Sequence, residues 1–191
     1  GLTKLIVEDK IIDDFYSGQP SVLNFDKGLY ANQFLLLTSS TDEKKTALAR
    51  YVGSANPLKK IVNIQTKIWG LRPRNKEQSF ALDLLTDPEV KVVSLIGQAG
   101  CGKTLLSLAA GLEQVLESKQ YKKLIVSRPV HPLGTQDIGY LPGTIEEKMA
   151  PWLAPIQDNL QFLMNDDKIA MSMYREQGKI EVEALSYIRG R

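Results

Sequence analysis

Eight consecutive residues have the types and spacing that bind phosphate groups. They match the pattern G-x-x-x-x-G-K-[ST] and are Gly97, Gln98, Ala99, Gly100, Cys101, Gly102, Lys103 and Thr104. The glycines let the backbone turn tightly and bring its N–H groups against an anion with no Cβ in the way. The Lys103 ammonium can reach β- and γ-phosphates, and the Thr104 hydroxyl suits Mg²⁺. The motif therefore predicts a site for a nucleoside triphosphate, namely ATP with Mg²⁺.

The sequence on either side of this loop predicts the elements that position it. Val90–Ile96 is a nearly continuous apolar run, typical of a strand buried on both faces of a parallel sheet. Lys103–Glu117 has helical periodicity, and Leu124–Ser127 reads as a second buried strand. The apolar face of the helix consists of Leu105, Leu108, Ala109, Leu112 and Leu116. A glycine-rich turn that merely caps a helix would not explain Lys103 and Thr104 at the helix start, so we favour the phosphate site in a βαβ unit.

Other segments of this region also carry local signals. Lys76–Leu85 is predicted to be a helix with Phe80, Ala81, Leu84 and Leu85 on its apolar face, and Asp87-Pro88 ends it. Asn75 is placed to cap this helix by accepting from the N–H of Glu77 or Gln78. Further helices are expected at Thr144–Ala150 and Ile156–Leu163, separated by Pro151 and Pro155, and at Asp167–Gln177. Lys179–Ala184 alternates as a third strand.

The first 66 residues differ from the rest of the chain in their pattern of expected strands and helices. Short strands are expected at Lys4–Glu8, Gln33–Thr38 and Leu48–Val52, with a short helix at Glu8–Tyr16. We therefore expect a small β-rich or mixed α/β domain at residues 1–66 and an α/β P-loop domain at residues 67–191.

The composition argues against a strongly basic, a disulfide-rich or a membrane-spanning protein. A net charge of +2 predicts no strong non-specific attraction to polyanions, so a nucleic-acid site would have to be a local patch. The single cysteine excludes an intramolecular disulfide framework. No apolar run approaches the ~20 residues that span a bilayer, and the chain starts without a signal-peptide layout. These features predict a cytoplasmic protein with no membrane partner, its N-terminus trimmed from a longer chain.

Two residues near the motif have alternative interpretations. The Gln78 amide offers a donor and an acceptor that suit the Hoogsteen edge of adenine, and a glutamine about 20 residues before a P-loop resembles the adenine-reading glutamine of superfamily 1 helicases. Asn75, three residues before Gln78, is a second candidate for nucleotide binding, although helix capping alone can explain it. Cys101 either is a small residue that tolerates the tight loop, which we favour, or is a thiol activated by Lys103 and the helix N-terminus.

Taken together, the motifs resemble the PhoH family of P-loop ATPases. The resemblance covers about residues 70–191 and rests on 74–78 (RNKEQ), 97–104, 126–130 (VSRPV), 139–143 (GYLPG), 147–151 (EKMAP) and 188–191 (IRGR). Residues 1–66 are similar, more loosely, to the segment that lies between a PIN ribonuclease domain and the ATPase in fusion members. The PIN domain itself is not in this sequence.

The resemblance implies a RecA-like core close to superfamily 1 helicases, ATP hydrolysis, action on single-stranded RNA, and a homo-oligomer such as a hexameric ring. Lys103 and Thr104 would take the catalytic phosphate and Mg²⁺ roles, and Gln78 the adenine role. Arg128 would contact the RNA backbone, with a solvated arginine at a strand end as the equal alternative. The acidic Asp-Glu-Ala-Gln motif of the family is expected beyond Arg191, so the RecA-like sheet would be incomplete and this piece alone would not be a competent ATPase.

Two other functions are also compatible with this sequence. One is a nucleotide-binding regulatory or scaffold module without helicase activity, and the weaker one is a small-molecule kinase. His131 is better read as a loop residue than as a base, and Asp166-Asp167 as a solvated turn. Trp152 and Tyr140 could stack on bases, but buried packing is the preferred interpretation.

Overall fold

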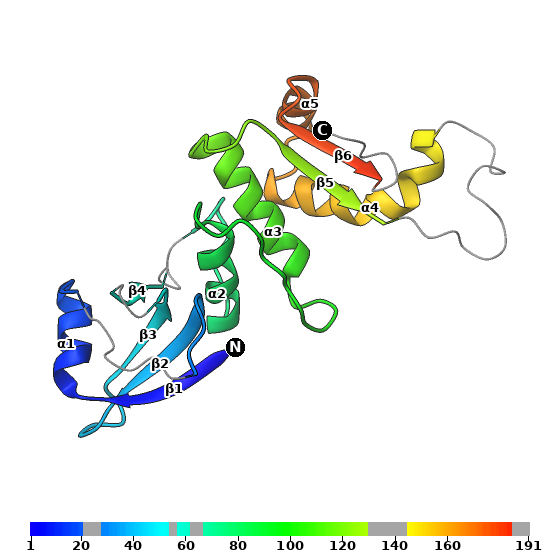
Figure 1. Ribbon diagram of the computed structural model, residues 1–191. Coiled ribbons are helices and arrows are strands. Elements are labelled where there is room, and N and C mark those ends of the chain that lie inside the picture. Colours follow the sequence, from blue (N-terminus) through cyan, green and yellow to red (C-terminus); the bar gives the residue numbers. More distant parts are fainter. Residues whose placement is uncertain (21–27, 54–56, 62–66, 130–144, 185–191) are drawn as a thin grey trace. The chain divides into compact units, whose positions relative to one another are not determined.

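The computed structural model describes residues 1–20, 28–53, 57–61, 67–129 and 145–184, with side chains in the last range from Leu153 to Glu183. The chain forms two compact units. The first consists of Gly1–Thr66 and Pro73–Asp87, and the second of Lys67–Arg72 and Pro88–Arg191. Figure 1 labels the helices and strands of the two units.

The first unit is built on a four-stranded sheet of order β1-β2-β3-β4. Strand β1 (Leu2–Val7) runs parallel to β2 (Gln33–Ser39). Strands β3 (Thr46–Tyr51) and β4 (Lys59–Lys60) continue the sheet in antiparallel fashion. Helix α1 (Asp9–Ser17) connects β1 to β2, and Gly18 ends it in the left-handed conformation at φ 79°. The predicted helix and the three predicted strands of this region are confirmed, with each end shifted by at most two residues.

A helix covers each face of this sheet (Figure 1). Successive side chains of a strand point to opposite faces, so Leu35 and Leu37 pack with Ile12 and Phe15 of α1 on one side. On the other side Phe34 stacks on Phe80 of α2 (Lys76–Leu85), with ring centroids 4.2 Å apart. Helix α2 has the predicted bounds.

The position of α2 in the fold was not evident from the sequence. We expected Lys76–Leu85 within the domain at residues 67–191, but Pro73–Asp87 belongs to the first compact unit. The apolar face of α2 includes the predicted Phe80 and Leu84, which pack with Ile61 of the same unit. Leu82, which was not predicted, is fully buried.

A buried ion cluster ties α2 to β3. Arg50 is only 1% exposed, and its Nε lies 3.2 Å from Oδ2 of Asp83. Its Nη2 donates to Oδ2 of Asp87, which also pairs with Nζ of Lys59 at 2.6 Å. Because removing charges from water is costly unless they are paired, this arrangement couples the end of α2 to the sheet.

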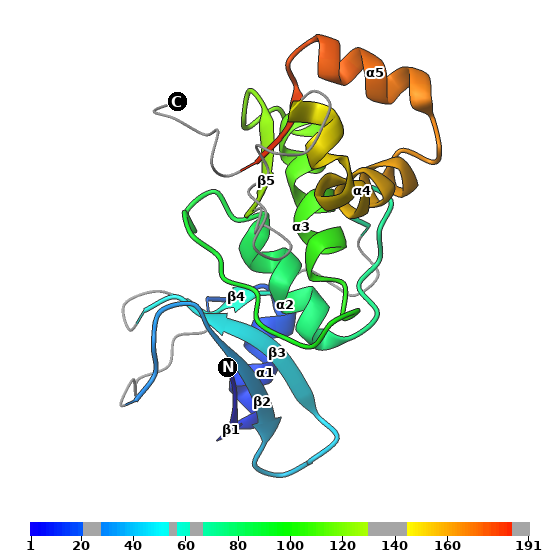
Figure 2. The same ribbon diagram turned by 90° about the vertical axis from the view of Figure 1, so that its right-hand side faces the viewer.

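Among its described residues, the second unit contains two parallel strands, three α-helices and one π-helical turn. Strand β5 (Leu124–Arg128) pairs with β6 (Ile180–Ala184), with Leu124 opposite Ile180. Helix α3 (Lys103–Leu112) continues into one π-helical turn, η1 (Glu113–Glu117). Helices α4 (Ile145–Leu163) and α5 (Lys168–Glu176) complete the unit (Figure 2). This arrangement is mixed α/β, as expected for a P-loop domain.

The apolar face predicted for the α3 region forms the centre of this unit. Leu108, Ala109 and Leu112 pack against Ile156 and Leu160 of α4. Around them lie Leu105, Leu116, Leu124, Val126, Leu163, Met164 and Ile180. Gly111 lets α3 approach β5 closely, since a Cβ there would lie 2.7 Å from the end of the Leu124 side chain.

Three predictions for this unit were wrong. Val90–Ile96 is not a strand, and Val92 and Ile96 are 86% and 95% exposed. A strand needs a neighbour to take its backbone hydrogen bonds, and none of the described strands pairs with this run. Strand β5 is buried on one face only, because Leu124 and Val126 face the core while Ile125 is 37% exposed.

The third correction concerns α4. Two helices interrupted at Pro151 and Pro155 were expected, yet a single helix runs through both prolines from Ile145 to Leu163. The side chains from Ile156 onward pack on α3, and this packing outweighs the hydrogen bonds that the prolines cannot donate.

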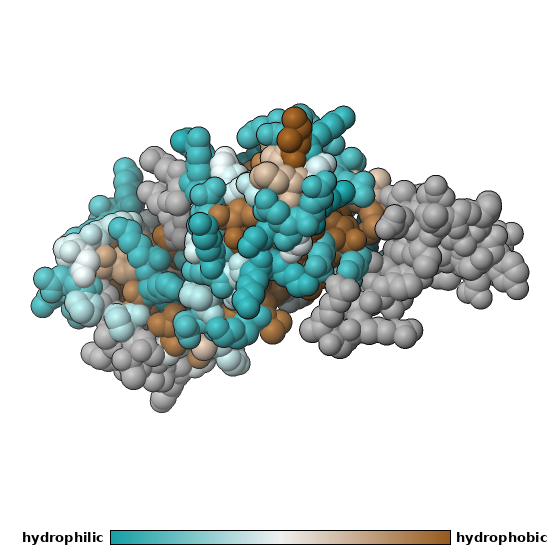
Figure 3. Space-filling model, turned by 90° about the horizontal axis from the view of Figure 1, so that it is seen from above, coloured by the Kyte–Doolittle hydropathy of each residue, from teal (hydrophilic) through white to brown (hydrophobic). Residues whose placement is uncertain are grey.

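The surface seen in Figure 3 is mainly hydrophilic, with apolar side chains in separate patches. Within the described parts of the chain, no helix has both the length and the apolar character required to cross a bilayer.

Candidate nucleotide-binding site

The phosphate loop depends on its glycines for its shape. Gly100 and Gly102 adopt φ angles of +78° and +91°, in the left-handed region that side-chain-bearing residues avoid. Gly97 has a different constraint, because a Cβ there would lie 3.1 Å from Sγ of Cys101. The backbone conformation therefore favours glycine at positions 100 and 102, whereas a side chain at position 97 would displace the Cys101 thiol slightly.

The side chain of Lys103 lies across the loop that precedes it. Its Nζ donates to the backbone oxygens of Gly97 at 2.9 Å and Gln98 at 2.7 Å. It also lies 3.6 Å from Sγ of the exposed Cys101. The ammonium is thus held by neutral carbonyl oxygens, which an anionic phosphate oxygen can replace favourably.

The loop leads directly into the N-terminus of α3. The N-cap is Gly102, and no side chain in the described residues caps this helix. The N–H groups of a first helical turn and the helix dipole together favour an anion. Thr104 is exposed in the same turn, where its hydroxyl is a suitable Mg²⁺ ligand. A glycine-rich loop, the Lys103 ammonium, an uncapped helix start and the Thr104 hydroxyl are together the chemical groups that bind the phosphates of a nucleotide with Mg²⁺.

Asn75 and Gln78 belong to the first unit and the loop belongs to the second. The predicted N-cap is confirmed, since Oδ1 of Asn75 accepts from the backbone N–H of Gln78 at 2.8 Å. The side chain of Gln78 turns back, with Oε1 accepting from the backbone N–H of Arg74 at 2.8 Å. The roles of both residues toward adenine remain predictions.

Other predicted residues lie at element ends or outside the described residues. Arg128 is exposed at the last position of β5. Asp167 caps α5 by accepting from the backbone N–H groups of Ile169 and Ala170, so the expected turn at Asp166-Asp167 also starts a helix. Residues 130, 131, 139–143 and 188–191, which include His131 and Tyr140, lie outside the described residues, as do the side chains of 147–151 and Trp152.

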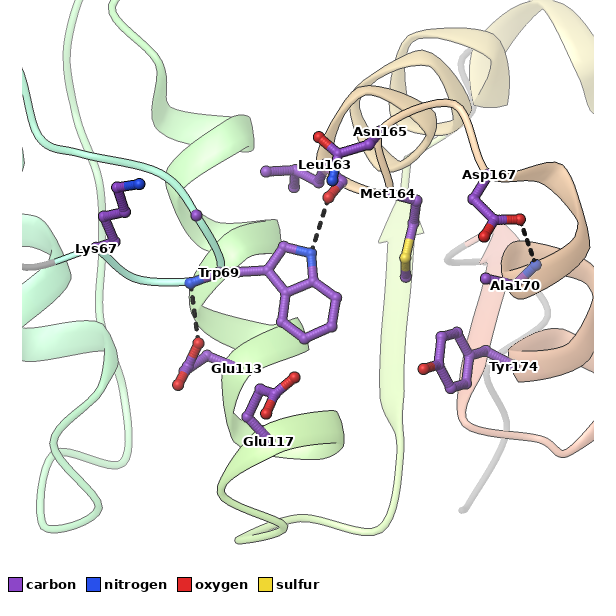
Figure 4. Close-up of a pocket in the computed structure, with 11 residues that line it drawn as sticks. Lys67, Trp69, Glu113, Glu117, Leu163, Met164, Asn165, Asp167, Ala170 and Tyr174 are labelled. Atoms are coloured by element: carbon purple, nitrogen blue, oxygen red, sulfur yellow. Dashed lines mark hydrogen bonds between the residues drawn. The ribbon is translucent and has the colours of Figure 1, made fainter.

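Sequence reasoning missed a cavity at the other end of the α3–η1 helical run. Figure 4 shows its lining, which includes Trp69, Glu113 and Tyr174. Trp69 and Gly70 form a two-residue turn at φ +48° and +72°, between reciprocal hydrogen bonds of Ile68 and Leu71. The Trp-Gly dipeptide was the available local signal for this turn.

The comparison with known protein families then identifies the chain. The family model described as "PhoH-like protein" matches residues 70–191. The chain belongs to the PhoH-like family. The expected resemblance to the PhoH family is thereby confirmed. Membership in this family supports nucleotide binding through a P-loop.

Curated relatives agree with this assignment. Protein PhoH2 of Bacillus subtilis is 43% identical over 195 residues, covering 100% of this chain and 44% of the relative. Protein PhoH2 of Mycolicibacterium smegmatis is 38% identical over 193 residues, covering 100% of this chain and 42% of the relative. Protein PhoH of Escherichia coli is 35% identical over 118 residues, covering 62% of this chain and 32% of the relative. The chain therefore spans less than half the length of these relatives, and no solved structure matches it.

Proposed function

We propose that this PhoH-like chain is the ATP-binding part of an ATPase that couples ATP hydrolysis to the binding or unwinding of RNA. The observation that carries the proposal is the loop at residues 97–104, with the Lys103 ammonium across it and an uncapped helix start behind it. This donor set has the chemistry that triphosphate binding requires.

Within this proposal each loop residue has one task. The backbone N–H groups of the loop and of the first turn of α3 bind phosphate oxygens. Lys103 exchanges its two carbonyl partners for β- and γ-phosphate oxygens, and Thr104 ligates Mg²⁺, which neutralises charge on the phosphates when bound. Gln78 reads the adenine, with Asn75 holding the start of the helix that carries it.

The remaining parts of the proposal concern the longer protein. Arg128, exposed at the end of β5, contacts the backbone of single-stranded RNA. A PIN ribonuclease domain, a RecA-like sheet completed by further strands and a homo-oligomeric, hexameric ring are proposed for the whole protein on the family resemblance. Residues 1–66 act as an accessory domain, against which α2 also packs, and residues 67–191 carry the start of the ATPase domain.

The test is RNA-stimulated ATP turnover in a protein of the full length of the relatives. Lys103→Ala removes the ammonium, and turnover should fall at least about a hundredfold because transition-state charge on the phosphates loses its cation. Lys122→Ala is the matched control, since Lys122 is exposed in the same unit and away from the loop. Undiminished turnover in Lys103→Ala would contradict the assignment.

A second measurement distinguishes an ATPase that is coupled to RNA from a nucleotide-binding scaffold. Arg128→Ala should raise the RNA concentration needed for half-maximal stimulation, because one phosphate contact is lost. Strand displacement driven by ATP supports unwinding. ATP-dependent assembly in sedimentation, without RNA stimulation, would instead support the nucleotide-binding scaffold.

A further inference from the structure

The second unit carries a cavity at the end of the α3–η1 helical run opposite to the phosphate loop. Its volume is about 520 Å³, within the usual range of ligand pockets. Figure 4 shows side chains from four segments around it. They come from the turn at Trp69, from η1, from the end of α4 and from α5.

The charge of this cavity is negative. Glu113, Glu117 and Asp167 line it against one ammonium, that of Lys67. One carboxylate oxygen of Glu113 accepts a hydrogen bond from the backbone N–H of Trp69 at 2.9 Å, and one oxygen of Asp167 accepts the hydrogen bonds that cap α5. Glu117 is exposed, and its carboxylate makes no hydrogen bond or ion pair within the described parts of the chain. The cavity thus holds carboxylate oxygens available to a cation.

The walls of the cavity are aromatic and polarizable. The indole of Trp69 is fixed by its N–H, which donates to the backbone oxygen of Leu163 at 3.0 Å. Tyr174 and Met164 form the opposite side (Figure 4). Aromatic faces together with carboxylates favour a planar, delocalised cation, because guanidinium stacks on rings and binds carboxylates with two parallel hydrogen bonds.

The backbone around the cavity is unusual in two independent places. Trp69 adopts φ +48°, which is rare for a bulky residue. Glu113 and Glu117 are the ends of a π-helical turn, a rare distortion that is frequent at functional sites. Both features bring lining side chains to the cavity, Trp69 on one wall and the two carboxylates on another.

We propose that this cavity binds an arginine side chain presented by a segment of a partner protein. The cavity is several times larger than one guanidinium group, so a peptide segment fills it where a lone small cation does not. A nucleic acid is disfavoured because the three carboxylates repel its phosphates. This inference does not depend on nucleotide binding at the phosphate loop.

The experiment uses the whole 191-residue chain and two five-residue peptides, Gly-Leu-Arg-Leu-Gly and the same peptide with citrulline in place of arginine. Citrulline keeps the shape and removes the charge. Binding is followed by NMR through the indole N–H signal of Trp69, which is distinguished from that of the second tryptophan by a Trp69→Phe variant. The arginine peptide should shift this signal saturably, and the citrulline peptide should not.

Glu117→Gln tests the carboxylates without changing side-chain size. The dissociation constant for the arginine peptide should rise about tenfold, as expected for the loss of one charge-assisted contact. Glu176→Gln is the matched control, since Glu176 is exposed on α5 outside the cavity and should leave binding unchanged. Unchanged affinity in Glu117→Gln, or equal binding of the citrulline peptide, would overturn the proposal. Equal affinity for free arginine amide would refute a protein segment as the occupant.

Discussion

Removing the buried guanidinium of Arg50 tests how the first unit is held together. Arg50 is 1% exposed, and the side chains of Asp83 and Asp87 are 3% and 6% exposed. Arg50→Met keeps much of the volume and deletes the charge. Asp83 then loses the guanidinium 3.2 Å from its carboxylate, while Asp87 keeps Lys59. Breaking a buried pair from one side costs about 3–5 kcal/mol, so the free energy of unfolding should fall by that amount.

The assay is urea denaturation followed by far-UV circular dichroism, with hydrogen exchange of the β2 and β3 amides as a local readout. Lys59→Met is the matched control. Its side chain is 46% exposed, so the loss should stay under about 1 kcal/mol. Arg50→Met combined with Asp83→Asn should recover part of the loss, because the neutral amide no longer needs a cation. A loss below about 1 kcal/mol in Arg50→Met would refute the argument that this cluster couples α2 to the sheet.

Three further predictions concern single side chains. Gly102→Ala forces a side chain into φ +91° and should cost about 1 kcal/mol or more in the loop, which a fluorescent ATP analogue would report as weaker binding. Hydrogen bonds from Ser39, and then Thr41, hold the pKa of Asp9 below its ordinary 3.8. Its stabilising contribution is therefore complete above about pH 3.8 and is lost as pH falls through the lowered pKa. Asp9→Asn should make the urea midpoint of unfolding depend less on pH in this acidic range. Asp167→Ala removes the cap of α5 and should destabilise it by about 1 kcal/mol, measured by amide exchange of its first turn.

The sequence by itself determined the features that depend on a few neighbouring residues. The bounds of α2 and the Asn75 cap followed from local hydrogen bonding and periodicity. The apolar face of α3 followed from the spacing of Leu108 and Leu112. The phosphate motif and the resemblance built on it were also readable in this way, because the loop, the lysine and the helix start are adjacent in the chain.

Tertiary structure decided the features that need partners distant in sequence. An apolar run such as Val90–Ile96 becomes a strand only where a neighbouring strand accepts its hydrogen bonds. Helix α4 runs through Pro155 while its following residues pack on α3, and α2 joined the first sheet because Phe80 stacks on Phe34. The cavity beside Trp69 could not be predicted either, since its carboxylates and its aromatic walls come from segments that lie far apart in the sequence, from Trp69 to Tyr174. Local patterns set which elements can form, and the packing of their apolar faces sets where they lie.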